Sequence, residues 1–487
     1  MLQELKAEAN RTLTENGAVT LQTTGSDCLD LFATIGALRG ASDGEIISRF
    51  VRAYAENQTL AMKLLFYSRD IRGGLGERRV FRILLRHLAC IAPGSVRRNL
   101  QLVSEYGRWD DLLVLFGTPC EKDMIALLRA QFDADLAALE EDTPVSLLGK
   151  WLPSVNTSNR DAVRMGKRLA RAFGLTDAAY RKALVRLRAK IRILENNLRE
   201  QDYSFDYAVQ PAKALLKYRH AFLTHDAERY QAYLRDVVSG KRKMHTGTLY
   251  PYELIQPFFS RDLASEEDDS QTLDAAWNTL DLGEPEENAL CVIDGSGSMY
   301  SVGSPLPITV ALSLGLYFAE RCTGEFHNHF ITFSEHPRLV EIKGADLAEK
   351  VRYCASFNEC ANTNIQKVFE LILDTAVHHR LSQEQLPQTL YFISDMEFDS
   401  CTVDAKSTNF AYAEELFARH GYRLPRVVFW NVQSRHEQQP VQMNKRGVVL
   451  VSGFTPKLFT MIARGCESPY AFMESVLLSE RYAPVCA

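Results

Sequence analysis

Apolar residues recur three and four positions apart along much of the chain between Ser26 and about Arg235. This spacing places them on one face of an α-helix, and the breaks between such segments are short and rich in Gly, Pro or Asp. Many short helices in series bury their apolar faces against their neighbours, so we predict a HEAT-like array of α-helical repeats. The clearest predicted helices are Leu60–Tyr67, Val80–Leu88, Leu112–Phe116, Asp123–Leu139 and Ala178–Glu200.

The pattern changes beyond residue 288, where short apolar runs alternate with amphipathic segments. Such alternation predicts a mostly parallel sheet with helices on both faces, a doubly wound, Rossmann-like arrangement. Ligands of these sheets bind at the carboxyl ends of the strands. The predicted strands are 289–293, 326–333, 338–342, 389–394, 426–431 and 447–451, and the predicted helices are 306–321, 365–373, 412–420 and one from Pro456.

Two acidic clusters, at 266–269 and 284–287, separate the helical pattern from the alternating one. We therefore predict a multidomain α + α/β protein. Residues 1–255 form the helical repeat domain, 256–287 form an acidic linker, and 288–487 form the α/β domain with a C-terminal helix.

Composition narrows the class of protein. The chain is 46% hydrophobic and 24% charged, which is ordinary for a globular protein, and no segment approaches the roughly 18 apolar residues of a membrane helix. The start of the chain lacks the features of a secretory signal. The ten cysteines are scattered without a Cys-x-x-Cys pair, which favours free, mostly buried thiols. We expect a cytoplasmic protein with no membrane partner.

The predicted strand 289–293 runs directly into Asp294-Gly295-Ser296-Gly297-Ser298. Alternate residues of this turn offer one carboxylate and two hydroxyls, and the glycines allow the backbone to bring hard oxygens together around a small cation. Two alternatives stay open. The segment could be a flexible Gly/Ser turn, or Asp294 could be the nucleophile of a phosphoryl-transfer enzyme, although Ser296 stands where such sites usually have a second acidic residue.

Two later loops extend this motif, because Thr363 precedes a predicted helix and Asp395 follows the predicted strand 389–394. Together the residues resemble the metal-ion-dependent adhesion site (MIDAS) of von Willebrand factor A (vWA) domains, except that Asn362 stands where many of these domains have Gly. The resemblance implies a vWA domain that binds Mg²⁺, or another divalent cation such as Mn²⁺ or Ca²⁺. By that match the oxygen ligands are Ser296, Ser298 and Thr363, with Asp294 and Asp395 acting directly or through water.

Charge is unevenly distributed in a chain whose net charge is -5. The segment between Lys150 and Lys243 contains about twenty-one Lys and Arg but only about nine Asp and Glu. A polyanion would therefore bind to the helical half. On the predicted helix Ala178–Glu200, one line of the surface carries four arginines, whose planar guanidinium groups suit phosphate. They could equally be a solvated face paired with acidic neighbours. The four residues are Arg181, Arg188, Arg192 and Arg199.

A second basic cluster surrounds the glycine-rich segment 73–76, and a third is Lys241-Arg242-Lys243. The glycine segment could hold a phosphate between Arg72, Arg78 and Arg79. No strand precedes it and no Lys-Ser/Thr follows it, so a tight turn between two helices is the favoured alternative. Four aromatic residues could stack on bases, although most are expected in the core; they are Tyr67, Tyr106, Trp109 and Trp151.

Several of these motifs together resemble a little-characterised family related to the Ro, or TROVE, proteins. Those proteins combine a ring of helical repeats with an A-domain and hold misfolded or small structured RNA. The resemblance implies RNA binding by the helical half and an A-domain that closes the ring. The motifs are 70–79 (DIRGGLGERR), 106–111 (YGRWDD), 150–154 (KWLPS) and Gly240-Lys241.

Two functions of different classes follow. The first is a non-enzymatic, intracellular RNA-binding or ribonucleoprotein scaffold protein, with structured or small non-coding RNA as its partner. The second is a protein-interaction module whose metal site captures an acidic residue of a partner without RNA. A hydrolase is the least favoured, because no Ser-His-Asp, Cys-His or HExxH arrangement is present.

Overall fold

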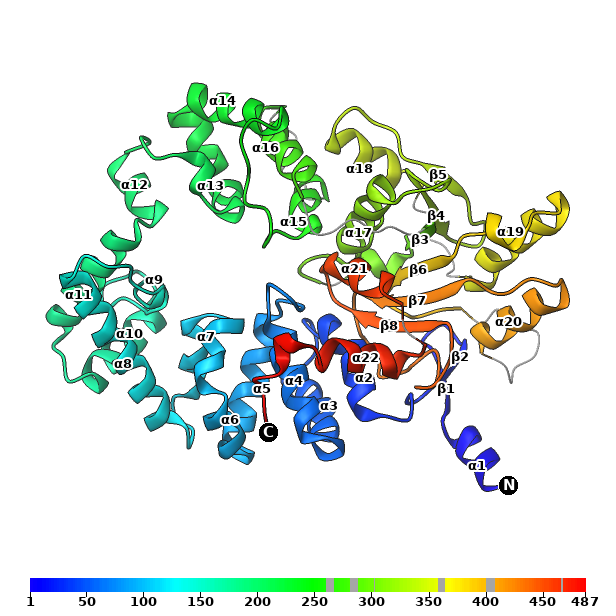
Figure 1. Ribbon diagram of the computed structural model, residues 1–487, viewed down its shortest axis with the longest axis horizontal. Helices are drawn as coiled ribbons and strands as arrows, with labels where there is room; N and C mark the ends of the chain where they lie inside the picture. Colours follow the sequence, from blue (N-terminus) through cyan, green and yellow to red (C-terminus); the bar gives the residue numbers. More distant parts are fainter. Residues whose placement is uncertain (260–266, 281–287, 302, 358–363, 400–407, 466) are drawn as a thin grey trace.

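In the computed structural model, which describes residues 1–259, 267–280, 288–301, 303–357, 364–399, 408–465 and 467–487, helices of the first half follow an arc that leaves an α/β domain and returns to it (Figure 1). The helices that precede the sheet are α1 (Leu2–Ala9), α2 (Asp27–Thr34), α3 (Asp43–Glu56), α4 (Gln58–Arg69), α5 (Arg78–Ile91), α6 (Pro93–Arg98), α7 (Val103–Tyr106), α8 (Glu121–Glu140), α9 (Leu148–Trp151), α10 (Arg160–Ala172), α11 (Asp177–Ile191), α12 (Leu194–Glu200), α13 (Ala212–His225), α14 (Ala227–Val238), α15 (Pro251–Ile255) and α16 (Glu267–Asn278).

Four of the predicted helices agree with these elements, since 60–67 and 80–88 lie within α4 and α5, 123–139 lies within α8, and 112–116 overlaps the 3₁₀ helix Trp109–Leu115. The prediction of one helix over Ala178–Glu200 is wrong. The helix stops at Ile191 because Arg192 adopts a left-handed conformation with φ 52° and Ile193 is extended. The line of four arginines is therefore divided between α11 and α12.

The interval 256–287, predicted as an acidic linker, contains the helix α16. Leu273, Ala276 and Trp277 are buried, and α16 packs against α13, α14 and α15 of the arc. The Trp277 indole also donates to Glu320 of the following domain at 2.7 Å. The helix α16 is thus a structural part of the ring rather than part of a spacer.

The α/β domain is built on a six-stranded sheet in the order β5-β4-β3-β6-β7-β8. Neighbouring strands are parallel except for β5, which pairs antiparallel with β4 at the edge. This mixed, mostly parallel sheet agrees with the prediction. Its elements are β3 (Ala289–Asp294), α17 (Pro307–Arg321), β4 (His329–Phe333), β5 (Leu339–Glu341), α18 (Leu347–Ala355), α19 (Ile365–His379), β6 (Thr389–Ser394), α20 (Asn409–Arg419), β7 (Arg426–Asn431), β8 (Val448–Ser452), α21 (Lys457–Ala463) and α22 (Pro469–Leu477).

Side chains alternate between two cores across this sheet, as the two-residue period of a strand requires. Trp430 packs on Phe459 of α21 on one face, and that core continues into the helical arc. Phe392 packs on Phe369 of α19 on the other face, where α20 completes a separate core. Helices therefore cover both faces of the sheet, as predicted.

The two ends of the chain cross the predicted domain boundary. A hairpin of β1 (Arg11–Leu13) and β2 (Val19–Leu21) lies against the α/β domain (Figure 1), where the Leu21 amide donates to Gln439 O at 3.0 Å. The 3₁₀ helix Ile35–Ala37, which follows α2, approaches β8 so closely that a Cβ on Gly36 would lie 2.6 Å from Ser452 O. The C-terminal end of the chain likewise contacts the arc: the side-chain amide of Asn99, which follows α6, forms hydrogen bonds with the backbone of Cys486.

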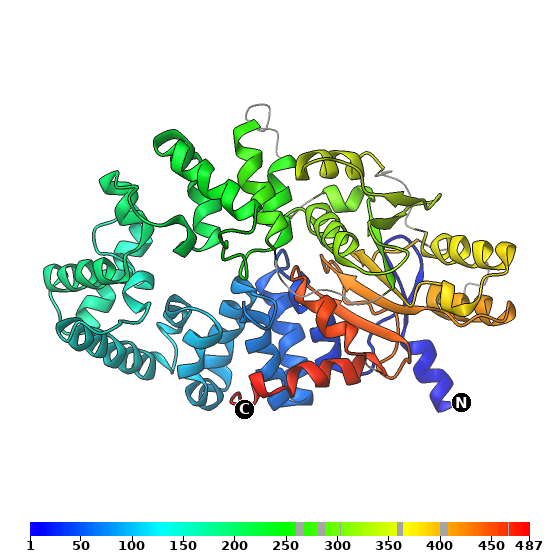
Figure 2. The same cartoon turned by 45° about the horizontal axis from the view of Figure 1, so that its top comes forward.

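At its other end the arc meets the α/β domain through α15, which packs on α17, and α16, which packs on α18 (Figure 2). Arc and domain thus form a closed ring. In the described part of the chain, no helix combines the length and apolar character needed to cross a membrane. Five of the seven cysteines described as free thiols are buried, in agreement with the prediction.

Candidate functional site

The chain reverses its direction across the sheet between β3 and β6. From β3 it continues to the neighbour β4 on one side, and it later returns to β6 on the other side. In open α/β sheets, ligands bind at such a point, beyond the carboxyl ends of the strands. Asp294 ends β3 and Asp395 follows β6, so the parallel pairing of these strands brings the two carboxylates to the same edge.

Four of the five residues predicted to hold a metal lie together at this edge. The Ser296 amide donates to Asp294 Oδ1 at 2.9 Å, and the hydroxyls of Ser296 and Ser298 lie 3.0 Å apart. Ser298 in turn hydrogen-bonds Asp395. The fifth residue, Thr363, lies outside the described residues. Whether the group binds a metal stays a prediction, but its two carboxylates and two hydroxyls are the hard oxygen donors that Mg²⁺ or Ca²⁺ takes.

Burial of this edge makes the free energy of a negative charge there unfavourable. Asp294 is fully buried and Asp395 nearly so. Desolvation and the neighbouring Asp395 raise the pKa of Asp294 to about 7, although the Ser394 hydroxyl donates to its Oδ2 at 2.5 Å. Desolvation also raises the pKa of Asp395, against the opposing effect of Arg435. A bound cation would relieve the unfavourable free energy of these two charges.

Arg435 is a part of the site that the sequence analysis missed. It follows β7, and its Nη2 lies 2.9 Å from Asp395 Oδ2 while its Nη1 lies 2.8 Å from Glu15 Oε2. Glu15 belongs to the tip of the β1–β2 hairpin, far away in sequence. No local pattern could have paired these residues, because they meet only when the hairpin folds against the sheet edge.

A second group of ligand-type side chains adjoins this ion pair. In this group, each of three side chains places one possible ligand atom within 4.8 Å of the other two; the residues are Glu15, Glu397 and His436. His436 Nδ1 is 2.8 Å from Glu397 Oε1, while the other carboxylate oxygen accepts from the Glu15 amide and from Gln438, each at 2.8 Å. These bonds occupy the buried Glu397 carboxylate and fasten the hairpin to the α/β domain.

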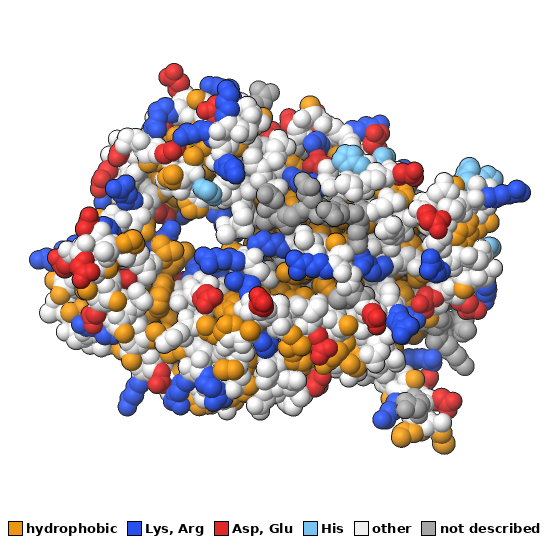
Figure 3. Space-filling model, in the orientation of Figure 1, with side chains coloured by type: hydrophobic (Ala, Val, Ile, Leu, Met, Phe, Trp, Pro, Cys, Tyr) orange, Lys and Arg blue, Asp and Glu red, His pale blue; other side chains and the backbone are white. Residues whose placement is uncertain are grey.

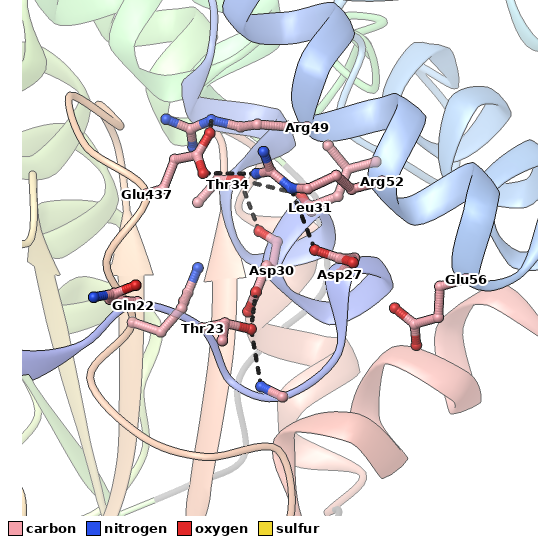
Figure 4. A pocket seen from close by; sticks show the side chains of 12 residues that line it. Gln22, Thr23, Asp27, Asp30, Leu31, Thr34, Arg49, Arg52, Glu56 and Glu437 are labelled. Atoms are coloured by element: carbon pink, nitrogen blue, oxygen red, sulfur yellow. Dashed lines mark hydrogen bonds and ion pairs between the residues drawn. The ribbon is translucent and has the colours of Figure 1, made fainter. Parts of the chain in front are cut away.

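A cavity of about 530 Å³ lies where the segment after β2, α2, α3 and the segment after β7 meet (Figure 4). Arg52 of α3 lies between Asp27, at 3.3 Å, and Glu437, at 2.6 Å. Burial raises the pKa of Asp30 to about 6, and Thr23 donates to its carboxylate at 2.5 Å. Charges of opposite sign thus pair with one another across this junction between the arc and the α/β domain.

The ten basic residues predicted to bind RNA fall into three groups. Five are exposed and have no side-chain partner among the described residues, four are exposed but form ion pairs, and one is half-buried. The first group is Arg72, Arg181, Arg192, Lys241 and Lys243; the second is Arg78, Arg79, Arg199 and Arg242; the last is Arg188.

Arg188 has a structural role that the sequence did not indicate. Its guanidinium donates to Gly149 O at 2.9 Å, to Leu152 O at 2.7 Å and to the Ser154 hydroxyl at 2.7 Å. These contacts join α11 to the turn after α9. The guanidinium of Arg188 therefore stabilises the packing of neighbouring helices in the arc.

The glycine-rich segment 73–76 is a tight turn between α4 and α5, which supports the alternative to a phosphate loop. Asp70 at its start is fully buried and accepts hydrogen bonds from Arg481 at 2.7 Å and from the Tyr482 hydroxyl at 3.1 Å. A Cβ on Gly74 would lie 2.1 Å from Tyr67 O. The motif therefore docks the C-terminal residues onto the arc.

Two of the basic segments converge at the closure of the ring. Lys457 of α21 donates to Arg72 O at 2.7 Å and lies 3.5 Å from Gly247 O, four residues after Lys243. Burial lowers the pKa of Lys457. Figure 3 shows Lys and Arg side chains gathered in a band along the middle of this face, beside the hollow enclosed by the arc.

A groove of about 620 Å³ lies between the 3₁₀ helix Trp109–Leu115 and α10. It is lined in part by the half-buried Trp151, over which Arg108 lies 3.9 Å from the ring centroid, and by Phe116, over which Arg168 lies at 4.1 Å. Aromatic rings beside arginines are typical of surfaces that receive nucleic-acid bases. Of the four aromatic candidates, Tyr67 and Tyr106 are core residues.

Comparison with protein families divides the chain in the same way as its fold. Residues 288–469 match the family described as "Domain of unknown function (DUF7788)". Residues 14–128 and 166–282 match "Domain of unknown function (DUF2828)". The second match includes both β2 and α16.

Among individual proteins, an uncharacterised protein of Acanthamoeba polyphaga mimivirus is 29% identical over 511 aligned positions. The alignment covers 96% of this chain and 87% of the viral protein. The crystal structure of the Deinococcus radiodurans Ro (RSR) protein is 13% identical, with a TM-score of 0.38 over 93% of this chain and 96% of that one.

Proposed function

We propose that this chain is a non-enzymatic RNA-binding scaffold of the cytoplasm, whose ring of helices binds structured or small non-coding RNA. The observation that carries the proposal is the group of exposed cations at the ring closure. Arg72, Lys241 and Lys243 have no side-chain partner among the described residues, so contact with phosphate would break no ion pair. The surplus of basic residues between 150 and 243 and the resemblance to Ro-related sequences support the same function.

Binding of an RNA hairpin, measured by fluorescence anisotropy across a series of salt concentrations, tests this function. Removal of Arg72, Lys241 and Lys243 together, each to Ala, should weaken binding by about tenfold or more near 0.1 M salt and lower the salt slope by about one per lost contact. The matched control replaces the ion-paired Arg78, Arg79 and Arg242 by Ala, which removes the same charge. An equal loss of RNA affinity in both triple variants, or an RNA affinity that does not change with salt concentration, would contradict the proposal.

We further propose that the α/β domain is a vWA domain that binds Mg²⁺, or a related divalent cation such as Mn²⁺ or Ca²⁺, at the edge of β3 and β6. Asp294, Ser296, Ser298 and Asp395 would hold the cation, together with Thr363. The bound cation would supply a positive charge that can accept a further oxygen ligand. The buried pair of carboxylates at the topological switch point supports this site.

The metal site also supports a second function, the capture of an acidic residue of a protein partner without RNA. A pull-down with the full-length protein, with and without chelator and with Asp294→Ala, separates the two. Loss of a partner in both treatments supports metal-mediated capture. Retention of that partner throughout, combined with salt-sensitive RNA binding, leaves RNA as the partner of the ring.

A further inference from the structure

Arg435 joins two carboxylates that have very different surroundings. Its Nη2 contacts Asp395, whose side chain is 1% exposed, and its Nη1 contacts Glu15, whose side chain is 51% exposed. The buried Nε of Arg435 has no hydrogen-bond partner among the described residues. Charge on the two carboxylates, rather than a complete set of hydrogen bonds, therefore holds the guanidinium in this position.

The hairpin that carries Glu15 is fixed by contacts that do not involve Arg435. The Thr14 hydroxyl donates to Phe398 O at 2.5 Å, and the Asn16 amide donates to Glu397 O at 2.7 Å. The Glu15 backbone amide donates to Glu397 Oε2 at 2.8 Å. Glu15 would therefore keep its place beside Arg435 if the contact between Arg435 and Asp395 were broken.

A divalent cation and a guanidinium that approach the same buried carboxylate repel each other. A cation bound at Asp395 would therefore weaken the contact that Arg435 makes there and favour its release. Its nearest remaining carboxylate is Glu15, which it already touches and which lies on the more exposed side.

We propose that Arg435 competes with the divalent cation for Asp395, and that Glu15 on the N-terminal hairpin retains the displaced guanidinium. This inference rests on the proposed metal site and concerns its regulation. Arg435 acts as an internal counter-ion that lowers the affinity for metal. Glu15 raises that affinity, because it stabilises Arg435 in the metal-bound state.

Mn²⁺ titrations of the full chain by isothermal calorimetry test the exchange. Arg435→Gln should bind Mn²⁺ about tenfold more tightly than the wild type, and Glu15→Gln about threefold more weakly. In the Arg435→Gln background, Glu15→Gln should have no effect, because there is no guanidinium to retain. Arg419→Gln, which removes an arginine from the exposed pair with Glu415, is the matched control and should bind as the wild type does.

The outcomes distinguish this inference from the metal site itself. Equal affinity of the wild type and Arg435→Gln overturns the competition but leaves the metal site standing. An effect of Glu15→Gln that persists without Arg435 overturns the exchange, because Glu15 would then act on the cation directly. No Mn²⁺ binding by either protein overturns both ideas. If Arg435→Gln does not fold, Arg435→Lys serves instead, since an ammonium cannot reproduce the two-nitrogen bridge and should also bind Mn²⁺ more tightly.

Discussion

At the edge of the sheet, Asp294 and Asp395 are buried beside Arg435, whereas at the ring closure Arg72, Lys241 and Lys243 are exposed without a described side-chain partner. The buried acids lower the stability of the metal-free protein, and a cation bound at the proposed site would compensate them. The exposed bases contribute little to stability, so they are available for a polyanion. Substitutions should therefore act mainly on folding and metal binding in the first region and on RNA binding in the second.

The largest effect is expected from Asp294→Asn, which should stabilise the metal-free protein at about pH 8. The folded pKa of Asp294, about 7, lies above its ordinary value, so its contribution to stability is present below about pH 4 and is lost as the pH rises through about 7. The isosteric amide removes a charge whose burial costs about 4 kcal/mol at high pH, from a pKa raised from 3.8 to about 7.

Urea unfolding in the presence of a chelator, at about pH 5 and about pH 8, measures this difference. The wild type should lose stability between the two pH values by more than the variant does. Asp374→Asn, at an exposed position of α19, is the control. A variant that is less stable than the wild type at about pH 8 would show that the Asp294 charge is already compensated.

Asp70→Asn tests whether the glycine-rich motif in the arc is structural, in contrast to the acidic motif of the sheet. The change leaves Arg481 without its buried charge partner, so it should lower the free energy of unfolding by about 3 kcal/mol. Thermal unfolding measures the loss. Asp161→Asn, in an exposed pair with Arg164, should change stability by less than about 0.5 kcal/mol. If the Asp70→Asn protein is as stable as the wild type but binds RNA more weakly, the glycine-rich motif is part of the RNA-binding surface instead.

Arg188→Ala separates the structural from the available arginines within the arc. Loss of three hydrogen bonds from one guanidinium should lower the free energy of unfolding by about 2 kcal/mol. Arg181→Ala on the same helix has no such bonds to lose and should leave the unfolding midpoint unchanged. Denaturant unfolding of the two variants checks the difference, and equal midpoints would refute the structural role of Arg188.

The sequence predicted the sheet better than the ring. The bounds of β6 and β7 were predicted to the residue, because each strand is a buried apolar run between polar or Pro-containing breaks. Asp294 and Asp395 followed from their place after such strands. The α11–α12 break was missed because a left-handed Arg192 has no Gly or Pro to mark it. In α16, acidic neighbours concealed the buried residues Leu273 and Trp277.

What the sequence could not predict are the contacts between distant segments. Arg435 meets Glu15 and Asp395 only because the hairpin folds onto the sheet edge. Similarly, Asp70 has the local appearance of a turn residue, and its role depends on Arg481 at the other end of the chain. Charge counts along the chain also could not separate free cations from paired ones, because the partners of Arg78 and Arg242 lie more than thirty residues away.

The smallest effect is expected from Arg181→Gln combined with Arg192→Gln, on the outer helices of the arc. Both arginines are exposed and lack a side-chain partner among the described residues, so the unfolding free energy should stay within about 0.5 kcal/mol of the wild type. RNA affinity at low salt should fall about threefold, since two weak phosphate contacts are lost, and the difference should vanish at high salt. The matched control is Arg186→Gln with Arg199→Gln, which removes the same charge from arginines paired with Glu140 and Glu200. Equal RNA affinity of the first variant and the wild type would confine the RNA surface to the ring closure.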